Sequence, residues 1–246
     1  MKNKQKNLIF VPGILGDSQF FQKQVSFFKD DYRVHTLSYS RWDITPFQVA
    51  AHIRELVISQ KIDQPIIWGV SYGGLGVLEY SLKYSGQTKA IILGCTNHAF
   101  RFRRIIKPVI RFSKPVIRKM PKKKLYRAFF KRVNFEPVSN SFKNLSPQEL
   151  DSAFEIHYQR ALALFSYHKK RELNQINCPC LIYAARKDRL ISTSRSFKMH
   201  RLIPKSQFLL VETNCHMPHA NRPQEINQSV SHFLETAVFA SALDRM

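Results

Sequence analysis

The chain has 246 residues, 44% of them hydrophobic and 23% charged. This length suits one large domain with an insertion, or at most two small domains, and no apolar run is long enough to suggest a membrane span. The formal net charge of +22 at pH 7 predicts an anionic surface or molecule among the partners of the protein.

The first residues are polar and basic, and they lead directly into a short apolar segment, Leu8–Val11. This segment is too short for the apolar part of a signal peptide, so we expect a cytoplasmic protein. The cysteines show neither a C-x-x-C pair nor the spacing of metal ligands, and we interpret them as reduced and mostly buried. They are Cys95, Cys178, Cys180 and Cys215.

Apolar runs typical of strands alternate with helical patterns along most of the chain. The predicted strands cover residues 8–11, 33–37, 65–69, 90–94, 180–184 and 207–211. This alternation predicts an α/β fold with a mostly parallel sheet and helices on both of its faces.

Three helices can be predicted together with their ends. Thr45 is a typical cap residue and Pro46 suits the first helical position, so we expect a helix from Pro46 to about Ser59. A second helix is expected over Tyr72–Tyr84. A third, Pro223–Val238, has an apolar inner face and closes the chain.

The alternation is interrupted over residues 97–172, which contain helical patterns but no convincing strand. We interpret this segment as an inserted, strongly basic helical cap, with residues 1–96 and 173–246 as the core. The second half of the cap, Pro147–Arg171, has the apolar periodicity of an amphipathic helix.

The first half of the cap is unusual in sequence. The pentapeptide KPVIR occurs at residues 107–111 and again, unchanged, at residues 114–118. Prolines at positions 108, 115 and 121 predict short helical pieces or a kinked rod, because they forbid one straight unbroken helix. The 35 residues from 101 to 135 contain 14 Lys and Arg residues and neither Asp nor Glu. Many charge runs are only solvated surfaces, but this lack of acids favours binding to something anionic.

Residues Gly69-Val70-Ser71-Tyr72-Gly73 match the pattern G-x-S-x-G, between a predicted strand and a predicted helix. In that context a serine lies on a sharp turn that holds its hydroxyl clear of the backbone, and the turn requires small residues on either side. Chance supplies such a pattern often enough that the motif alone decides little. The prediction that Ser71 is a nucleophile therefore depends on its partners.

A serine hydroxyl needs a base to remove its proton, and the base needs an acid to orient it and stabilise its charge. Asp188 follows the predicted strand 180–184, and His216 follows the predicted strand 207–211. Ser71 also follows a strand, and the carboxyl ends of parallel strands share one edge of a sheet. We therefore predict Ser71 as nucleophile, Asp188 as acid and His216 as base.

This order of nucleophile, acid and base, together with the segments Ile176–Tyr183 and Cys215–Pro218, resembles the α/β-hydrolase superfamily. The resemblance is to the esterase-like members, among them carboxylesterases, thioesterases and pimeloyl-carrier-protein methyl esterases. It extends from Leu8 to about Leu234, apart from the first half of the cap. It implies an α/β-hydrolase fold that lacks the leading antiparallel hairpin and keeps about six mostly parallel strands.

The resemblance also implies two backbone donors for the oxyanion of an acyl transfer. One is the amide of Tyr72, directly after the nucleophile, and the other is the amide of Ile14 in the loop Pro12–Gly16. Pro12 stands where the family usually has a histidine. Because the donor is a backbone group, this departure keeps the donor but removes a side chain that often braces the loop.

Each candidate residue also has a simpler interpretation. Asp188 could be a turn residue after a strand, and His219 competes with His216 as the base. Asp17 and Asp43 are interpreted as loop or surface residues. The agreement of three separate segments in order and position favours the catalytic interpretation.

These observations predict a serine hydrolase that cleaves a carboxylic ester or thioester through an acyl-enzyme, without a metal or organic cofactor. The basic cap would rest on an anionic membrane surface, making the protein peripheral at a membrane, or it would dock an acidic acyl carrier protein. The second case suits a carrier-protein methyl ester esterase or an acyl thioesterase. A non-catalytic member of the fold that binds lipid or a partner is a further alternative. Nucleic acid is not expected as a partner, because no nucleic-acid module is recognised.

Overall fold

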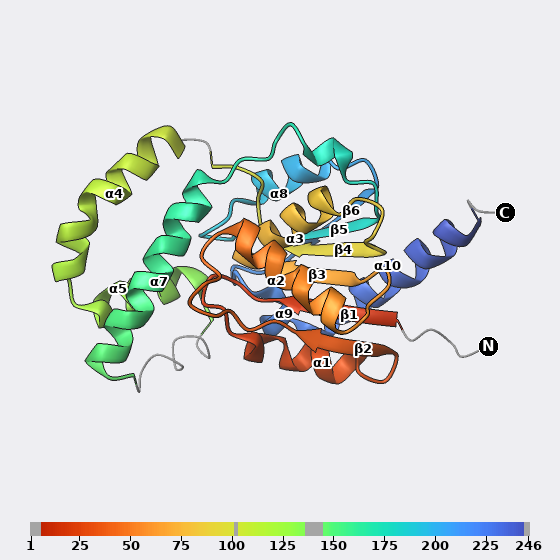
Figure 1. The fold of residues 1–246 in the computed structure, drawn as a ribbon, viewed down its shortest axis with the longest axis horizontal. Helices are drawn as coiled ribbons and strands as arrows, with labels where there is room; N and C mark the ends of the chain where they lie inside the picture. Colours follow the sequence, from red (N-terminus) through yellow and green to blue (C-terminus); the bar gives the residue numbers. More distant parts are fainter. Residues whose placement is uncertain (1–5, 101–102, 136–144, 244–246) are drawn as a thin grey trace.

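Six parallel strands form the sheet of this protein in a computed structural model, which describes residues 6–100, 103–135 and 145–243 (Figure 1). Residues 1–5 and 244–246 of the predicted core, and residues 101–102 and 136–144 of the predicted cap, lie outside these ranges. The strands are β1 Lys6–Val11, β2 Tyr32–Thr36, β3 Ile66–Val70, β4 Ala90–Gly94, β5 Cys180–Ala185 and β6 Ser206–Val211. The predicted sheet of about six mostly parallel strands is confirmed.

The strand order is β2-β1-β3-β4-β5-β6, and every pairing is parallel. From β1 the chain moves outward to β2 and then returns to pair β3 with β1, so that Val11 lies beside Gly69. Because of this reversal, the segments that follow β1 and β3 leave the sheet side by side. Ligand sites of open parallel sheets form at such a position.

Helices cover both faces of the sheet. On the first face they are α2 Pro46–Ser59, α3 Tyr72–Lys83 and α8 Thr193–His200. On the second face they are α1 Gln22–Phe28 and α10 Pro223–Leu243. The shorter elements are the helix α9 Pro218–Asn221 and the 3₁₀ turns η1 Ser18–Phe21 and η2 Leu173–Gln175.

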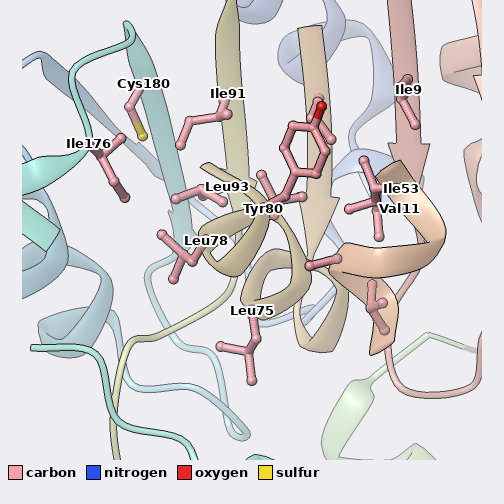
Figure 2. Packing of buried hydrophobic residues seen from close by; sticks show 14 of the residues in the cluster. Ile9, Val11, Ile53, Leu75, Leu78, Tyr80, Ile91, Leu93, Ile176 and Cys180 are labelled. Carbon is pink, nitrogen blue, oxygen red and sulfur yellow. The ribbon is translucent and has the colours of Figure 1, made fainter. Parts of the chain in front are cut away.

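Strand β1 shows how the sequence produces these two layers. Ile9 and Val11 pack into the core of the first face, and Leu8 and Phe10 pack into the core of the second. This alternation follows from the two-residue period of a strand. Figure 2 shows the first core, in which side chains from α2 and α3, among them Ile53, pack toward the strands. A sheet buried on both faces gives its central strands the continuous apolar runs seen in the sequence.

Capping chemistry explains where α2 begins. The Thr45 hydroxyl accepts a hydrogen bond from the Gln48 amide, and the Gln48 side chain accepts one from the Thr45 amide. This reciprocal pair satisfies two amides that have no helical acceptor. The predicted bounds of α2 are confirmed, whereas α10 extends beyond the predicted end at Val238.

Three helices of the predicted cap lie together at the left of Figure 1, and α4 is the outermost of them. They are α4 Arg103–Lys119, α5 Lys122–Val133 and α7 Pro147–Ser166. Both α4 and α5 pack on α7. The boundaries 97 and 172 of the cap remain a prediction.

The expected effect of the prolines is corrected in part. Helix α4 continues through Pro108 and Pro115 and curves in Figure 1, so this stretch is not a set of short pieces. Pro115 lacks an amide hydrogen, which leaves the Arg111 carbonyl without a helical donor. Beside it, the Ile110 carbonyl accepts hydrogen bonds from the Ser113 and Tyr158 hydroxyls. The second of these bonds ties the proline-containing stretch of α4 to α7. No helix within the described ranges has the length and apolar character needed to cross a bilayer.

Candidate active site

Ser71 occupies a strained turn between β3 and α3. Its φ of 51° and ψ of −117° lie outside the regions that residues with a side chain ordinarily adopt. The Ser71 amide donates to the Gly94 carbonyl (2.8 Å), and the Thr96 hydroxyl donates to the Ser71 carbonyl (2.7 Å). These bonds hold the strained backbone at the carboxyl edge of the sheet.

The glycines of the motif are required by close approach of the backbone. A Cβ atom at Gly69 would lie 2.8 Å from the Gly73 carbonyl oxygen, and one at Gly73 would overlap the carbonyl oxygens of Val11 and Pro12. Distances below 3 Å to backbone atoms cannot be relieved by a rotamer change. Gly73 therefore lets the turn pack directly against the loop that follows β1.

The structure brings together the three residues predicted as nucleophile, base and acid. Ser71 Oγ lies 2.9 Å from His216 Nε2, and His216 Nδ1 lies 2.7 Å from Asp188 Oδ2. A carboxylate only accepts hydrogen bonds, so Nδ1 carries the proton of a neutral imidazole. Nε2 is then the acceptor for the Ser71 hydroxyl, which is the arrangement that proton removal from serine requires.

Asp188 is held as a buried carboxylate. Its side chain is 1% exposed, and burial alone would raise its pKa. The charge and hydrogen bond of His216 and the amides of Leu190 and Ile191 outweigh burial, so the pKa of Asp188 lies below its ordinary value. The two amides donate to Oδ1 at 2.7 and 3.0 Å. Oδ2 is thereby left to His216.

The loop that carries His216 is fixed by the C-terminal end of α5. The His216 amide donates to the Val133 carbonyl at 2.9 Å. Next to it, Asn134 adopts a left-handed conformation that ends α5, and its side-chain amide donates to Asn214 Oδ1 at 2.7 Å. A helix of the predicted cap therefore positions the backbone of the predicted base.

The loop Pro12–Gly16 lies against Ser71, because a Cβ atom at Gly13 would be 3.6 Å from the Ser71 Cβ. Within the loop, the Gly16 amide donates to the Gly13 carbonyl at 2.9 Å. The amide of Tyr72 is the first of helix α3 and has no helical acceptor. The two predicted oxyanion donors, Ile14 and Tyr72, thus belong to segments that both line the cavity at Ser71.

Arg160 of α7 braces this loop from the side of the predicted cap. Its guanidinium is buried and donates to three backbone carbonyls, those of Asp43 (2.8 Å), Ile14 (2.9 Å) and Ser40 (3.0 Å). It also lies over the ring of Tyr39, whose hydroxyl donates to the Pro12 carbonyl at 2.7 Å. Arg160 and Tyr39 brace the loop in which proline replaces the usual histidine. Sequence reasoning missed both, since nothing in the pattern distinguishes Arg160 from the other basic residues.

His219, the competing candidate for the base, lies in the second core. Its ring packs 5.0 Å from that of Phe21, and its carbonyl accepts from Gln24. Burial and the nearby His216 lower its pKa to about 3. A histidine held neutral and hydrogen-bonded to neither Ser71 nor Asp188 within the described ranges does not fit the role of base.

Asp43 lies in a loop, as expected, but it is buried and its carboxylate is 3.2 Å from His52 Nδ1. The backbone carbonyl of Asp43 accepts a hydrogen bond from the Arg160 guanidinium. Asp17 caps the turn η1 by accepting from the Gln19 amide. Neither aspartate contacts His216 among the described interactions.

One group of side chains in the described ranges has the composition of a metal site. Potential ligand atoms of Cys95, Asp188 and His216 all lie within 4.8 Å of one another. Burial raises the pKa of the Cys95 thiol well above its ordinary value, which disfavours the thiolate that a metal needs. His216 Nδ1 and Asp188 are bonded to each other. The three side chains are therefore better explained as a protonated Cys95 thiol beside the bonded Asp188–His216 pair than as a metal site.

A cavity of about 620 Å³ opens at Ser71. Its walls are mostly apolar and come from both sides of the site: from the loops and turn of the core, and from α5 and α7. The apolar side chains include Ile14, Leu15, Phe20, Phe100, Phe129, Leu164, Phe165 and Met217. A volume of this size accommodates a small ligand, and the lining suits an acyl chain.

A family model described as the Alpha/beta hydrolase family matches residues 8–229 of the chain. The chain belongs to this family. A comparison with curated protein sequences found no match.

Solved structures of similar fold have low sequence identity to this alpha/beta hydrolase. An esterase from Thermogutta terrifontis superposes with a TM-score of 0.79 at 19% identity, covering 94% of this chain and 90% of that chain. The enol-lactonase from Burkholderia xenovorans gives 0.77 at 15% identity, covering 94% and 92%. MenH from S. aureus gives 0.71 at 19% identity, covering 94% of each chain. At such identities the likeness establishes the fold alone.

Proposed function

We propose that this alpha/beta hydrolase is a serine hydrolase that cleaves a carboxylic ester or thioester through a covalent acyl-enzyme. The observation that carries this proposal is the chain of hydrogen bonds from Ser71 Oγ to His216 Nε2 and from His216 Nδ1 to Asp188. The strained turn under Ser71 and the apolar cavity beside it support the same conclusion.

In the proposed reaction, Ser71 Oγ attacks the acyl carbon while His216 Nε2 takes the hydroxyl proton. The carbonyl oxygen becomes an oxyanion that accepts from the amides of Ile14 and Tyr72. As the tetrahedral intermediate collapses, the bond to the leaving alcohol or thiol breaks and His216 returns the proton to it. Water then repeats the sequence on the acyl-enzyme, with His216 as base, and releases the acid. Asp188 orients His216 and stabilises its charged form.

Covalent labelling tests the proposal most directly. A fluorophosphonate should form an adduct on the peptide that contains Ser71, detected by mass spectrometry of the digested protein. The intact protein should also hydrolyse a panel of p-nitrophenyl esters and acyl thioesters. A protein that neither reacts with the probe nor turns over either panel would favour the non-catalytic alternative.

A hydrolase acting on acyl groups bound to an acidic carrier protein remains the second candidate. It is favoured by the exposed cations of α5, whose inner side lines the cavity through Phe129 and Val133. Opposite charges steer such partners together. A preference for carrier-bound acyl thioesters over the same acyl group on a small thiol, lost in high salt, would identify this candidate.

Arg160 is proposed as a positioning residue for the Ile14 donor. Arg160→Met should lower kcat by about 10- to 100-fold with little change in KM, because loss of the brace lets the loop shift relative to the oxyanion. It should also lower the free energy of unfolding by about 3 kcal/mol, since buried carbonyls lose their donor. The readout that separates catalysis from folding is the inhibition constant of a trifluoromethyl ketone, measured well below Tm, which should weaken in parallel with kcat.

A matched control is Arg54→Met. Arg54 also stacks on a tyrosine, Tyr84, and donates to an oxygen acceptor, Gln87, but at the opposite edge of the sheet. Equal kinetic effects of both variants would contradict the positioning role. So would an unchanged affinity of Arg160→Met for the trifluoromethyl ketone.

Two cationic side chains, Arg132 and Arg189, line the mostly apolar cavity and are exposed to solvent. The one carboxylate among the lining residues, Asp17, accepts a hydrogen bond from the Gln19 amide. We expect them to favour substrates with an anionic group remote from the ester. Arg132→Gln should raise KM about two- to fivefold for a half-ester of a dicarboxylic acid, the range of an exposed ion pair, and leave KM for the neutral diester of equal length unchanged. Arg201→Gln, an exposed arginine outside the cavity, serves as control. Equal KM changes for half-ester and diester would contradict the expectation.

A further inference from the structure

Helix α4 presents apolar side chains to solvent along one face. Ile105 is 65% exposed, Val109 59%, Phe112 80% and Val116 65%. Their spacing of four, three and four residues places them on one side of a helix, within a narrow stripe. The stripe extends over about 17 Å of helix axis. We call these four residues the α4 apolar stripe.

The opposite side of α4 packs against α7. The Tyr158 hydroxyl donates to the Ile110 carbonyl at 2.8 Å, and Lys114 Nζ donates to Glu155 Oε1 at 2.8 Å. Arg118 also pairs with Glu155. All three contacts are with α7, so the α4 apolar stripe is not the face that attaches the helix to the protein. Exposed apolar groups that gather in this way mark an interaction surface.

Cations flank the stripe and continue onto the next helix. Exposed side chains that form no ion pair among the described residues are Arg111 and Lys119 of α4 and Lys123, Lys124, Arg127, Lys131 and Arg132 of α5. Within the described ranges, the acids that form ion pairs with these helices are Glu155 and Asp151 of α7, and their partners are Lys114, Arg118 and Lys122. The surface around the stripe therefore has unneutralised positive charge.

We propose that the α4 apolar stripe and the surrounding cations dock the protein on an anionic lipid surface. A helix with an apolar face and lysine or arginine beside it lies in the interface of a bilayer, with the apolar side chains among the acyl chains and the cations at the head groups. Phe112, the most exposed of the four, enters farthest. Docking does not depend on the chemistry at Ser71.

Other occupants fit these features less well. An acidic carrier protein matches the charge of this surface. To cover the α4 apolar stripe, however, the carrier would need an apolar groove complementary in shape to the helix, whereas a lipid surface adapts to the shape of the helix. A second copy of the chain matches the apolar stripe, but it would bring two strongly cationic surfaces together. A bilayer supplies apolar and anionic groups in adjacent layers, which is the arrangement that α4 presents.

Cosedimentation with vesicles tests the proposal, in full-length protein with Ser71→Ala so that no lipid is hydrolysed. Vesicles are phosphatidylcholine alone or with 30% phosphatidylglycerol in the preparation, in about 50 or 500 mM salt. We expect binding only to the phosphatidylglycerol vesicles and release in high salt. In the same background, Phe112→Ser/Val116→Ser should weaken binding at least about tenfold, from lost apolar burial.

The matched control is Phe47→Ser/Ile58→Ser, in which two exposed apolar residues of α2, each 60% exposed, are replaced. Thermal unfolding verifies that both variants are folded. Absence of binding to the anionic vesicles in low salt, or equal weakening by both double variants, would overturn the proposal. Binding of an acidic acyl carrier protein, or dimerisation, that depends on Phe112 and Val116 without vesicle binding would overturn it in favour of that partner. Because Ser71 is absent throughout, failure here leaves the proposed hydrolase activity untouched.

Discussion

Replacing Ser71 with alanine is expected to lower kcat for ester hydrolysis by about 10⁶-fold, the loss typical when the nucleophile of a serine–histidine pair is removed. The alanine keeps the turn but removes the Oγ atom that bonds to His216 Nε2. Labelling by a fluorophosphonate should disappear as well. Substrate binding should change little, because the apolar walls of the cavity remain.

Ser85→Ala is the control for this variant. Ser85 is exposed just beyond the other end of α3, so it tests for general effects of a serine substitution near that helix. Hydrolysis within a factor of ten of wild type in Ser71→Ala would refute Ser71 as the nucleophile. Equal labelling of wild type and Ser71→Ala would lead to the same conclusion.

Replacing Asp188 with asparagine should lower kcat by about 10⁴-fold while the fold is preserved. An amide can donate a hydrogen bond to His216 Nδ1, which favours the tautomer with the proton on Nε2. That tautomer cannot accept the Ser71 proton. The measurement is the pre-steady-state rate of acylation, which should fall with kcat, with KM close to wild type.

Asp43→Asn is a close structural match, because Asp43 is also buried and bonded to a histidine nitrogen, that of His52. It should lower activity far less than Asp188→Asn, since His52 lies outside the chain of bonds to Ser71. Similar losses of kcat in the two variants would contradict the role of Asp188.

The lowered pKa of Asp188 adds an acid-stability test. Its ionised form contributes stability above its ordinary value of 3.8, and that contribution is lost as the pH falls through the lower folded-state pKa. Asp188→Asn removes a group that titrates there. The difference in unfolding free energy between wild type and variant should therefore shrink as the pH falls below about 4. A difference independent of pH would argue against a depressed pKa.

Patterns local in sequence predicted the sheet well. Each predicted strand ends within two residues of an observed one, because a strand buried on both faces is a continuous apolar run bounded by turn residues. The position of Ser71 followed from small residues that the turn demands, as the close approach at Gly73 confirms. The proximity of Asp188 and His216 followed from parallel strands sharing one edge.

Contacts between segments distant in the sequence were beyond such reasoning. Arg160 reaches the Ile14 carbonyl across 146 positions of chain, and its role depends on how α7 packs on the core. For a related reason, the sequence did not decide between short helical pieces and a kinked rod for α4. A proline costs a helix one hydrogen bond, whereas the contact of the Tyr158 hydroxyl with the Ile110 carbonyl, which holds α4 in place, comes from another helix. Rules that are local in sequence include the hydrogen bond lost at a proline but not the contacts that a distant helix makes.

The hydrogen bond from the His216 amide to the Val133 carbonyl limits how this enzyme can be engineered. Exchange of the predicted cap would replace the part of the cavity wall that comes from α5 and α7. Here an exchanged module would also have to provide an acceptor at the end of α5, or the imidazole would lose a backbone support. A graft that keeps Val133 and Asn134 as its junction and replaces the preceding residues would respect that requirement.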